Sequence, residues 1–491
     1  TATPTATPPT TVVPTFVPTQ VPTPEPTGSV QTMVLVYAAL DNNLSTNEGG
    51  MSWERIVNRL EAGVSDSVHV RLFIDALGPN NSYVYDVLRD NNHLCPNLSD
   101  VRCGSRYQEG VNWWRQANDD SAQISAIYNF FKQGVVAAPP QAKVVAVFIG
   151  HGNGWSANGL PWLPSRWADQ TTGGFLWDDT VDGEVGSRSA STQEIGDALR
   201  QVVADTGRKF SLLYLDACSM GMAEVAYELR DTANYLLASP NTDWATFPYH
   251  RLLAQVGGDK TDLAVGEAWL KEEAQVLRGP DPQPFTLVLF DLSKMNDLLA
   301  AASNLADELI QLLPTQRDLV VAAATKTTRY ESNYDGALDT LDTYADLNSF
   351  SQQILDALSP ASAAGKAATA VKSQIALAVV SSDFERGSPW KFPKQTWSWP
   401  NFGGMGVYLP LPQDEEAKRS FYTASNLSWA ADGHWDEFLA ALWPDQPART
   451  GGAAAPTLPR CVSTTNCATL LASPLLPVDD ALYLPLILDI R

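Results

Sequence analysis

Basic residues are scarce in this 491-residue chain, which has 33 Lys and Arg against 55 Asp and Glu and a formal net charge of −22. A surface with so few cations neutralises little phosphate, so a general nucleic-acid binder is disfavoured. The excess of acid suits a soluble secreted protein and favours attraction of basic substrates. The alternative interpretation is that the charge serves solubility alone.

Long uninterrupted apolar runs are also missing. The C-terminal segment ALYLPLILDIR is too short, and too interrupted by Pro, to span a bilayer, so we expect no transmembrane segment. Apolar residues still make up 44% of the chain, and they include 15 Trp, which suffices for a large core. There is no initiator Met and no signal peptide, so we expect a mature or trimmed chain whose export signal is not part of it.

Cysteine is rare, with five residues in the whole chain. Cys95 and Cys103 lie close together in one polar segment, and Cys461 and Cys467 lie close together in another, so each pair can close a small local disulfide. Neither pair has histidines at metal-ligand spacing, which argues against zinc. Local disulfides imply an oxidising compartment, and Cys218 is left over as a free thiol.

The two ends of the chain have compositions that differ from the middle. The first 28 residues are a Thr/Pro repeat with one charge, which favours extended polyproline II and cannot form a packed core. Beyond Pro444 the composition turns to Ala, Gly, Pro and Thr. We therefore predict a disordered linker at 1–29, a folded domain at 30–445 with its core at about 30–300, and a low-complexity tail at 446–491.

Candidate chemistry centres on residues 212–230, LLYLDACSMGMAEVAYELR. An apolar run precedes Asp216 and an amphipathic pattern follows, which predicts a buried strand leading directly into a helix. Cys218 lies at the junction, where free backbone N–H groups and the helix dipole favour a thiolate. The alternative is a small cysteine buried in the core.

A histidine occupies the matching place on another predicted strand. Residues 143–155, KVVAVFIGHGNGW, form an apolar strand of parallel-sheet type that ends at His151. Parallel sheets place active sites at the carboxyl ends of their strands, so His151 and Cys218 form a candidate base and nucleophile. Glycine at 152 lets a substrate backbone approach closely and leaves its N–H free to donate.

Periodicity predicts the remaining elements. We expect strands at 30–39, 68–76, 235–239, 285–291 and 406–411, and helices at 51–62, 121–133, 263–276, 298–313, 348–358, 367–380 and 435–442. A capping box, Ser191 with Glu194, starts another helix that runs to about 204 and is followed by Gly207. Asp41, Asn42, Asn43 and Asp75 follow strand ends on the same rim as His151, although turn chemistry explains them adequately.

Several segments together resemble the clostripain family of cysteine peptidases, which belongs to the caspase-like clan. They are LVYAALDNNLS, FIGHGNGW, WDDT, LDACSMGMAEVAYELRDTANYLLAS, TLVLFDLSKM, TYADLNSF and GGMGVYLPLP. The resemblance covers roughly residues 31–443. It implies an α/β fold, a caspase-like three-layer sandwich with a central, mostly parallel sheet flanked by helices.

The resemblance also implies a function, that of a bacterial extracellular or cell-surface cysteine endopeptidase acting on protein or peptide substrates. Cys218 would attack the scissile carbonyl, and His151 would act as general acid and then as base. The N–H groups of Gly152 and Cys218 would stabilise the oxyanion. We identify no third catalytic group, and we expect a monomer that requires no cofactor.

Asp216 is expected to receive a basic P1 side chain, as the equivalent acid does in the family, with Arg preferred and Lys accepted. The alternative is that Asp216 only caps the following helix. The loop at 240–250, PNTDWATFPYH, should wall this pocket, so we include Ser239, Asp243 and Tyr249 among the substrate-binding residues. The family's Gly-Trp is replaced here by Ala-Thr-Phe, which puts the detailed shape of the pocket in doubt.

Residues 156–190 show little periodicity, and the resemblance implies that a region of this kind is cut during activation. Arg166 and Arg188 are the candidate processing sites, and Arg188 lies in the more flexible context. The alternative is that no cleavage occurs. Asp178 and Asp179 are candidates for a Ca²⁺ site of the kind that some relatives require, but two adjacent carboxylates do not define one.

Two other functions stay open. A degenerate, non-catalytic surface binding or adhesion protein is favoured by the altered 240–250 loop and the stalk-like N-terminus. Another thiol hydrolase of α/β type, such as an acyltransferase or esterase, is disfavoured because the chain has no Gly-x-Ser-x-Gly elbow.

Overall fold

The computed structural model describes residues 30–45, 53–78, 82–87, 89, 113–115, 120–155, 174–181, 184–333, 335–411, 422 and 427–443. The chain divides into two units, Thr1–Ala448 and Arg449–Arg491, and the described residues belong to the first. The predicted domain limits at 29 and 445, the cysteines of both predicted disulfides and Arg166 lie outside the described residues, so these predictions stay open.

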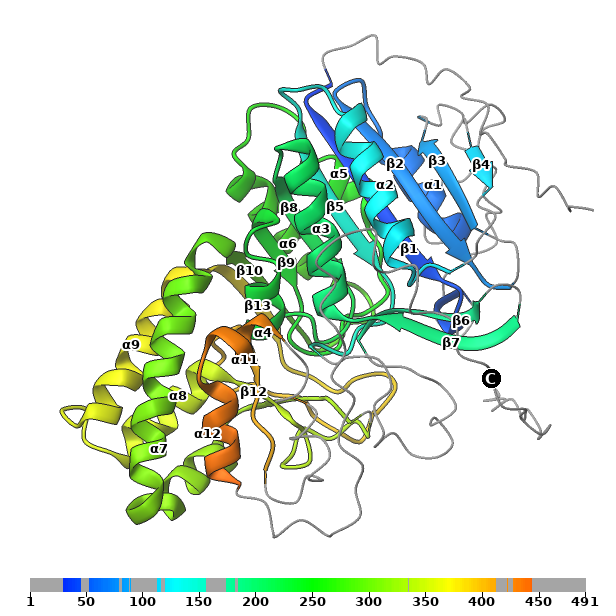
Figure 1. Ribbon diagram of the computed structural model, residues 1–491. Helices are drawn as coiled ribbons and strands as arrows, with labels where there is room; N and C mark the ends of the chain where they lie inside the picture. Colours follow the sequence, from blue (N-terminus) through cyan, green and yellow to red (C-terminus); the bar gives the residue numbers. More distant parts are fainter. Residues whose placement is uncertain are drawn as a thin grey trace, which may run out of the picture. The chain divides into compact units, whose positions relative to one another are not determined.

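A nine-stranded sheet forms the centre of the domain, in the order β13-β10-β9-β8-β5-β1-β2-β3-β4 (Figure 1). Strands β9, β8, β5, β1 and β2 run parallel, and two antiparallel strands extend each edge. The predicted mostly parallel α/β sheet is confirmed. The strands are β1 (Thr32–Leu40), β2 (Val68–Ala76), β3 (Ser82–Val87), β4 (Trp113–Arg115), β5 (Lys143–Ile149), β8 (Phe210–Asp216), β9 (Ala233–Ala238), β10 (Phe285–Asp291) and β13 (Val379–Glu385).

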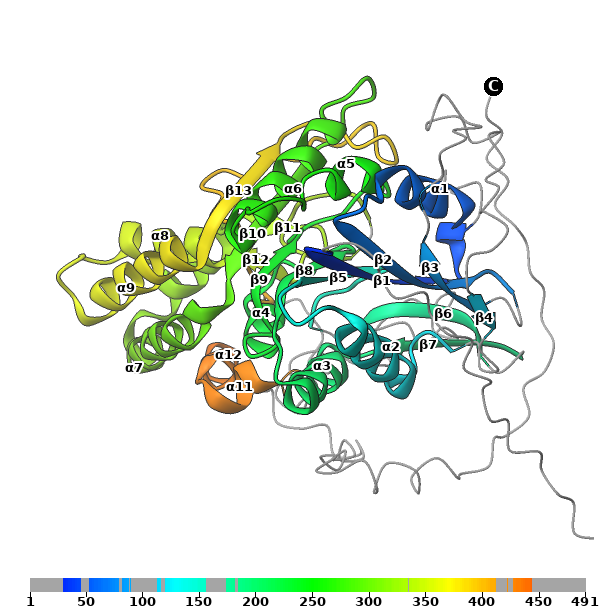
Figure 2. The same cartoon turned by 90° about the horizontal axis from the view of Figure 1, so that it is seen from above.

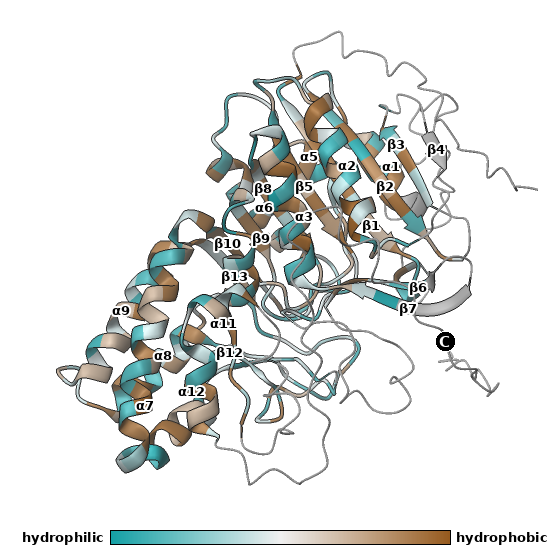
Figure 3. Ribbon diagram, in the orientation of Figure 1, coloured by the Kyte–Doolittle hydropathy of each residue, from teal (hydrophilic) through white to brown (hydrophobic). Residues whose placement is uncertain are grey.

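Helices cover both faces of this sheet, which gives the three layers that Figure 2 shows edge-on. One face packs against α2 (Ile124–Ala137) and α3 (Thr192–Thr206). The other packs against α1 (Trp53–Gly63), α5 (Tyr249–Leu253) and α6 (Asp262–Leu277). Every residue of β1 is buried, which explains why its sequence shows a continuous apolar run without alternation. Figure 3 shows the same contrast, with brown strands between helices that are partly teal.

Local signals in the sequence fix the limits of α3. The Ser191 side chain accepts from the backbone of Glu194, and the Glu194 carboxylate accepts from the backbone of Ser191. Gly207 ends the helix with a left-handed φ of 68°, which glycine adopts without a steric penalty. The predicted capping box and terminating glycine are confirmed.

The C-terminal part of the domain is mainly helical. It contains α7 (Met295–Lys326), α8 (Leu347–Ala357), α9 (Ala363–Ala378), α11 (Ser428–Asp432) and α12 (Trp435–Leu442), with a small sheet of β11 (Arg329–Tyr330), β12 (Tyr344–Asp346) and β14 (Gly406–Tyr408). The α7 helix extends past its predicted end because Pro314 produces only a local kink, with Gln316 at a non-helical φ of −136°. No helix in the described ranges is both long and apolar enough to cross a membrane.

Two predicted features were wrong. The region before α3 is not irregular throughout, because β6 (Phe175–Val181) and β7 (Glu184–Ala190) form an antiparallel hairpin. The helix expected to reach residue 380 ends at Ala378, and the chain continues as the edge strand β13. The β13 strand was missed because its pairing partner, β10, is far away in the sequence. The hairpin pairs neighbouring strands and is joined to the rest of the fold where Phe175 bridges to Gly152.

Candidate active site

The candidate site lies where two neighbouring strands end. β5 and β8 run parallel with Ile149 paired to Asp216, so His151 and Cys218 each lie two residues beyond a paired position. The two segments stay in contact past the strands, since a Cβ atom on Gly152 would lie 2.5 Å from the carbonyl oxygen of Cys218. The structure therefore brings the predicted base and nucleophile to one edge of the sheet.

The backbone of Gly152 is oriented by the β6 strand on its other side. Gly152 forms an isolated antiparallel bridge with Phe175, and the residues flanking Gly152 make the hydrogen bonds of that bridge, at 3.0 and 2.8 Å. In such a pair the central residues do not bond each other. The N–H of Gly152 is consequently directed away from β6, on the side of β8 and Cys218.

Two neighbours fix the His151 imidazole. Its Nε2 donates to Oδ1 of Asn43 at 2.5 Å, and its ring packs on Trp177 with 4.8 Å between the ring centroids. Burial, followed by the positive charge of Lys391, lowers the pKa of His151 to about 4. The imidazole is therefore neutral at physiological pH, and Nδ1 is the nitrogen that can accept a proton.

The residues after β1 support this arrangement. Asn43 opens a short 3₁₀ turn, Asn43–Ser45, directly after β1. The Asn42 amide donates to the carbonyl of Ala39 at 3.1 Å and to the carbonyl of Trp177 at 2.8 Å. Asn42 therefore ties the strand that carries Trp177 to the end of β1.

Cys218 lies in a turn and not at the start of a helix. The α4 helix (Ala223–Glu228) begins only at Ala223. Ser219 adopts a left-handed φ of 61°, and its N–H donates to the carbonyl of Asn241 at 2.8 Å. The chain therefore runs beside the segment that follows β9 before α4 starts. The predicted direct junction of strand and helix was wrong.

The thiol is held in its protonated form. Asp243 donates its backbone N–H to Sγ of Cys218 at 3.4 Å. Burial is the main cause that raises the pKa of Cys218 to about 12, and the charges of Asp243 and Glu331 act in the same direction. Cys218 is a free cysteine in the described part of the chain. A neutral thiol needs a base to become a nucleophile, and His151 on the adjacent strand end is the candidate.

Three carboxylates from different elements interact with one another, and we call them the acid cluster. They are Asp216 of β8, Asp243 of the loop after β9, and Glu273 of α6. Burial raises the pKa of Asp216 to about 7. Burial, followed by the charge of Asp216, raises the pKa of Glu273 to about 8. Burial, followed by the charges of Asp216 and Glu273, raises the pKa of Asp243 well above its usual range.

The acid cluster has few hydrogen-bond donors around it. Tyr249 donates its hydroxyl to Asp216, and Thr246 donates its hydroxyl to Glu273. Oδ2 of Asp243 and Oε2 of Glu273 are buried and have no hydrogen-bond partner among the described residues. A buried acceptor without a donor costs roughly 1–3 kcal/mol, so a cationic donor entering the cluster would be stabilised strongly.

The loop that departs from the family pattern is held by its own contacts. Ser239 is fully buried, and its hydroxyl lies 3.1 Å from the carbonyl of Asn241 and 3.1 Å from the hydroxyl of Thr286. Arg59 of α1 donates to the carbonyl of Phe247 at 2.8 Å, and Phe247 has a left-handed φ of 47°. Ser239 thus shapes the loop, and its direct contact with a substrate stays a prediction.

The processing and calcium candidates within the described residues lie on the β6–β7 hairpin. Arg188 belongs to β7 and forms an ion pair with Asp120, so its context is an ordered strand and not the flexible segment that we expected. Oδ2 of Asp178 accepts from the N–H and the hydroxyl of Ser121, at 2.7 and 3.0 Å. No group of three or more His, Cys, Asp or Glu in the described ranges fits a metal ion. The calcium site at Asp178 and Asp179 stays a prediction.

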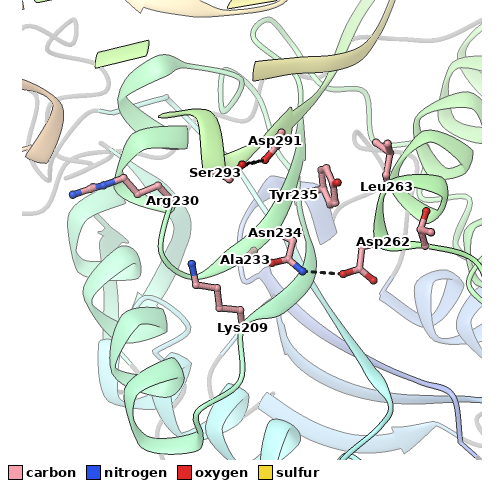
Figure 4. Close-up of a pocket in the computed structure, with 10 residues that line it drawn as sticks. Lys209, Arg230, Ala233, Asn234, Tyr235, Asp262, Leu263, Asp291 and Ser293 are labelled. Atoms are coloured by element: carbon pink, nitrogen blue, oxygen red, sulfur yellow. Dashed lines mark hydrogen bonds between the residues drawn. The ribbon is translucent and has the colours of Figure 1, made fainter. Parts of the chain in front are cut away.

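A cavity of about 380 Å³ lies at the opposite end of the parallel strands, because its lining includes the residues that begin β9. Figure 4 shows the residues that line it. Its lining includes Lys209, which precedes β8, and Asn234 near the start of β9. Asp262 and Asp291 also contribute, and Asn234 donates to Asp262 at 2.9 Å. None of the predicted site residues lines this cavity.

The sequence analysis missed three residues that this geometry involves. Asn43 was explained by turn chemistry, and Trp177 was noted only as part of a family segment. Glu273 carries the clearest signal, because a carboxylate lies four residues from both Trp269 and Leu277 on the buried side of α6. An acid on an apolar helical stripe usually has a local function.

A mostly parallel sheet that places a cysteine and a histidine on adjacent strand ends fits a thiol hydrolase. The model of the clostripain family matches residues 84–443, which is most of the chain. The chain therefore belongs to the clostripain family of cysteine peptidases, and it is a peptide hydrolase. No curated protein sequence matches it.

Solved structures of similar fold include two secreted C11 cysteine proteases from Bacteroides thetaiotaomicron, one of them in complex with an irreversible peptide inhibitor. The inhibitor complex is 18% identical with a TM-score of 0.56, covering 83% of this chain and 99% of that one. The second is 14% identical with a TM-score of 0.51, covering 84% and 99%. An inactive zymogen C11 protease from Parabacteroides distasonis is 16% identical with a TM-score of 0.54, covering 84% and 99%. At these identities the likeness shows the fold.

Proposed function

We propose that this chain is a secreted endopeptidase that cleaves after Arg, and less efficiently after Lys, with Cys218 as nucleophile and His151 as its base. The observation that carries the proposal is the acid cluster beside the thiol. Asp243 contacts the sulfur through its backbone N–H at 3.4 Å, and its carboxylate interacts with those of Asp216 and Glu273. A cationic side chain that enters the cluster would place the carbonyl that follows it next to Cys218.

The first half of the reaction forms a thioester. Nδ1 of His151 accepts the thiol proton while Sγ of Cys218 bonds to the scissile carbonyl carbon. The N–H groups of Gly152 and Cys218 donate to the oxyanion, and each such donor contributes about 3–4 kcal/mol in the transition state. The orientation of the Gly152 N–H, away from β6, supports this role. The imidazolium then protonates the leaving amine, and the C–N bond breaks.

The second half releases the product. A water molecule loses a proton to His151 as its oxygen attacks the thioester carbonyl, and the oxyanion forms again at the same donors. The C–S bond breaks, and the proton returns from the imidazolium to Cys218. The proposed steps use a thiol, an imidazole and backbone N–H groups, so we propose that no cofactor is required. Activity is therefore expected to survive EDTA, and loss with recovery on adding Ca²⁺ would contradict this.

The acid cluster would bind the P1 side chain. A guanidinium offers five donors in a planar fork, which suits carboxylates that approach from different elements. Tyr249 orients Asp216 by its hydrogen bond, and Ser239 shapes the loop that presents Asp243. An ammonium offers three donors at one point and would engage fewer of these oxygens.

Two substitutions test the proposal on a panel of fluorogenic peptides that differ only at P1. Cys218→Ala should abolish cleavage, and Asp216→Ala should remove the preference for basic P1 residues while leaving measurable cleavage. Asp197→Ala is the matched control. The Asp197 side chain is 55% exposed, and it belongs to α3, on the face of the sheet opposite to α6. Retained activity in Cys218→Ala, or an unchanged P1 profile in Asp216→Ala, would refute the corresponding assignment.

The alternative of a degenerate binding protein is tested on the same samples. A peptide electrophile with Arg at P1 should label the wild-type protein at Cys218 and leave Cys218→Ala unlabelled. Mass spectrometry of the intact protein reads out both results. An unlabelled wild-type protein that also fails to cleave every peptide in the panel would favour the binding function.

We further propose that the chain is exported and cuts itself after Arg166 or Arg188. The secreted and zymogen descriptions of the similar structures support this. Arg188 would first have to leave its ion pair with Asp120 and its strand pairing. Intact-mass analysis should find two fragments for the wild type and one chain for Cys218→Ala. Identical fragments from purified Cys218→Ala would rule out self-cleavage.

A further inference from the structure

Glu273 is positioned to face the site from the helix layer. It lies on α6, whose residues Trp269 and Leu277 pack into the apolar cluster that also contains Tyr214 of β8. Glu273 is 1% exposed, whereas an unperturbed glutamate, with a pKa of about 4.3, is charged at neutral pH. Asp216 follows Tyr214 at alternate spacing along β8 and therefore points to the same face of the sheet.

The contacts of Glu273 leave one oxygen unused. Oε1 accepts the hydroxyl of Thr246, which belongs to the loop that also presents Asp243. Oε2 is buried without a hydrogen-bond partner in the described part of the chain. The nearby Arg251 bonds instead to Glu272 at 2.8 Å and to Gln275 at 2.9 Å. Arg59, the other cation near Glu273, donates to the carbonyl of Phe247 at 2.8 Å. No ion pair of Glu273 with either arginine is formed among the described residues, so neither accounts for the free oxygen.

Burial increases through the acid cluster in a defined order. Asp243, whose backbone contacts the thiol, is partly exposed, Asp216 is 5% exposed, and Glu273 is 1% exposed. The hydroxyl of Tyr214 lies in the same region and also has no hydrogen-bond partner among the described residues. Glu273 on α6 and Tyr214 on β8 thus offer buried polar atoms without hydrogen-bond partners among the described residues, while Asp243 is the member of the cluster that contacts Cys218.

We propose that Glu273 is the specificity-determining residue that makes this peptidase prefer Arg to Lys at P1; the inference rests on the proposed cleavage after basic residues. A guanidinium carries five donors spread over three nitrogens, so in this proposal it donates to Asp243 and Asp216 and also to Oε2 of Glu273. A lysine ammonium is satisfied by the two carboxylates nearer the entrance. Glu273 adds a hydrogen bond for one substrate and not for the other, which is how a polar site discriminates.

Glu273→Gln tests the proposal because it keeps the shape and the Thr246 contact but removes the charge. We expect kcat/KM for an Arg reporter to fall by about 30-fold, mostly through KM, and kcat/KM for the Lys reporter to change less than about threefold. The matched control is Glu272→Gln, the neighbouring residue, which pairs with Arg251 on the outer side and should leave the Arg-to-Lys ratio unchanged. An equal fall for both reporters, or an unchanged ratio, would overturn the role of Glu273.

A second variant covers the case in which Glu273→Gln does not fold, as judged by thermal unfolding. Glu273→Asp keeps the charge and withdraws the carboxylate by one methylene, so it should also lower the Arg-to-Lys ratio, while a ratio equal to that of the wild type would overturn the proposal. Cleavage of the reporters by the wild-type protein distinguishes a wrong role for Glu273 from a wrong proposed function. If it cleaves neither Arg nor Lys reporters but cleaves another P1 residue, the basic specificity itself is wrong.

Discussion

Charged side chains at the two ends of the central parallel strands differ in their exposure to solvent and in their hydrogen-bond partners. At the amino end, the cavity keeps its charges near solvent and beside partners, with the Lys209 side chain 45% exposed and Asp262 accepting from Asn234 (Figure 4). At the carboxyl end, three carboxylates are buried together with too few donors. The cavity lies at the amino end and the candidate active site at the carboxyl end, so here buried, unsatisfied charge points to the candidate site and the cavity does not.

Burying carboxylates has a cost in stability that depends on pH. A carboxyl group whose pKa is raised in the folded protein loses stability as the pH rises from its unfolded pKa to its folded pKa. Glu273, with a folded pKa of about 8, therefore weakens the fold at neutral and alkaline pH. No comparable penalty applies to exposed charges such as Lys209, because water solvates them.

The largest expected effect at the carboxyl end comes from removing the base. His151→Ala should lower kcat for an Arg reporter by about 10³-fold or more, because the thiol, with a pKa of about 12, then has no proton acceptor. KM should change little, since His151 lies outside the acid cluster. Steady-state kinetics on a folded variant checks this. A loss below tenfold would mean that another group deprotonates Cys218.

The pH dependence of KM should show the acid cluster directly. Asp216 and Glu273 have pKa values of about 7 and 8, so lowering the pH from 9 to 6 protonates them and removes the attraction for a cation. KM for an Arg reporter should rise by about tenfold over this range. Tyr249, Tyr214, Asp243, Arg59 and Arg251 also face these carboxylates and modulate the midpoint.

The same titration should leave kcat almost unchanged between pH 6 and 9. The catalytic pair keeps one protonation state there, because the pKa of His151 is about 4 and that of Cys218 is about 12. Asp216→Asn should flatten the KM profile and serves as the control. If kcat changed with the same midpoint pH as KM, the acid cluster would also control the His151 and Cys218 pair, which would contradict this prediction.

A smaller effect is expected from Asn43, which positions the imidazole. Asn43→Ala removes the acceptor for Nε2 of His151, so the ring loses its preferred tautomer and orientation. We expect kcat to fall by about five- to tenfold with KM unchanged. Asn43→Asp should restore the acceptor and raise the pKa of His151, which would move the acid limb of kcat upward. An unchanged kcat in Asn43→Ala would leave Trp177 as the residue that orients the ring.

The sequence predicted those parts of the site that depend on neighbouring residues. The buried runs ending at Ile149 and Asp216, the glycines after His151 and the Ser191 capping box all have local causes, and the structure has them where expected. The start of α4 was missed because the N–H of Ser219 donates to the carbonyl of Asn241, in the segment that follows the neighbouring strand β9. Glu273 was missed because its partner Thr246 and its neighbour Asp216 come together only when α6 packs on β8.

The smallest expected effect is at the amino end of the strands. Asp262 lies in the first turn of α6 and accepts from Asn234, so Asp262→Asn should cost about 0.3–1 kcal/mol of stability through the helix dipole. Along α6, Asp262 lies about 16 Å from Glu273 of the acid cluster, which exceeds the Debye length of about 8 Å at physiological salt. The kcat/KM for an Arg reporter should therefore stay within about twofold of the wild type. Because Asp216→Asn removes the same charge at the other end, a loss of more than tenfold in Asp262→Asn would show that net acidity, and not the buried cluster, attracts the substrate.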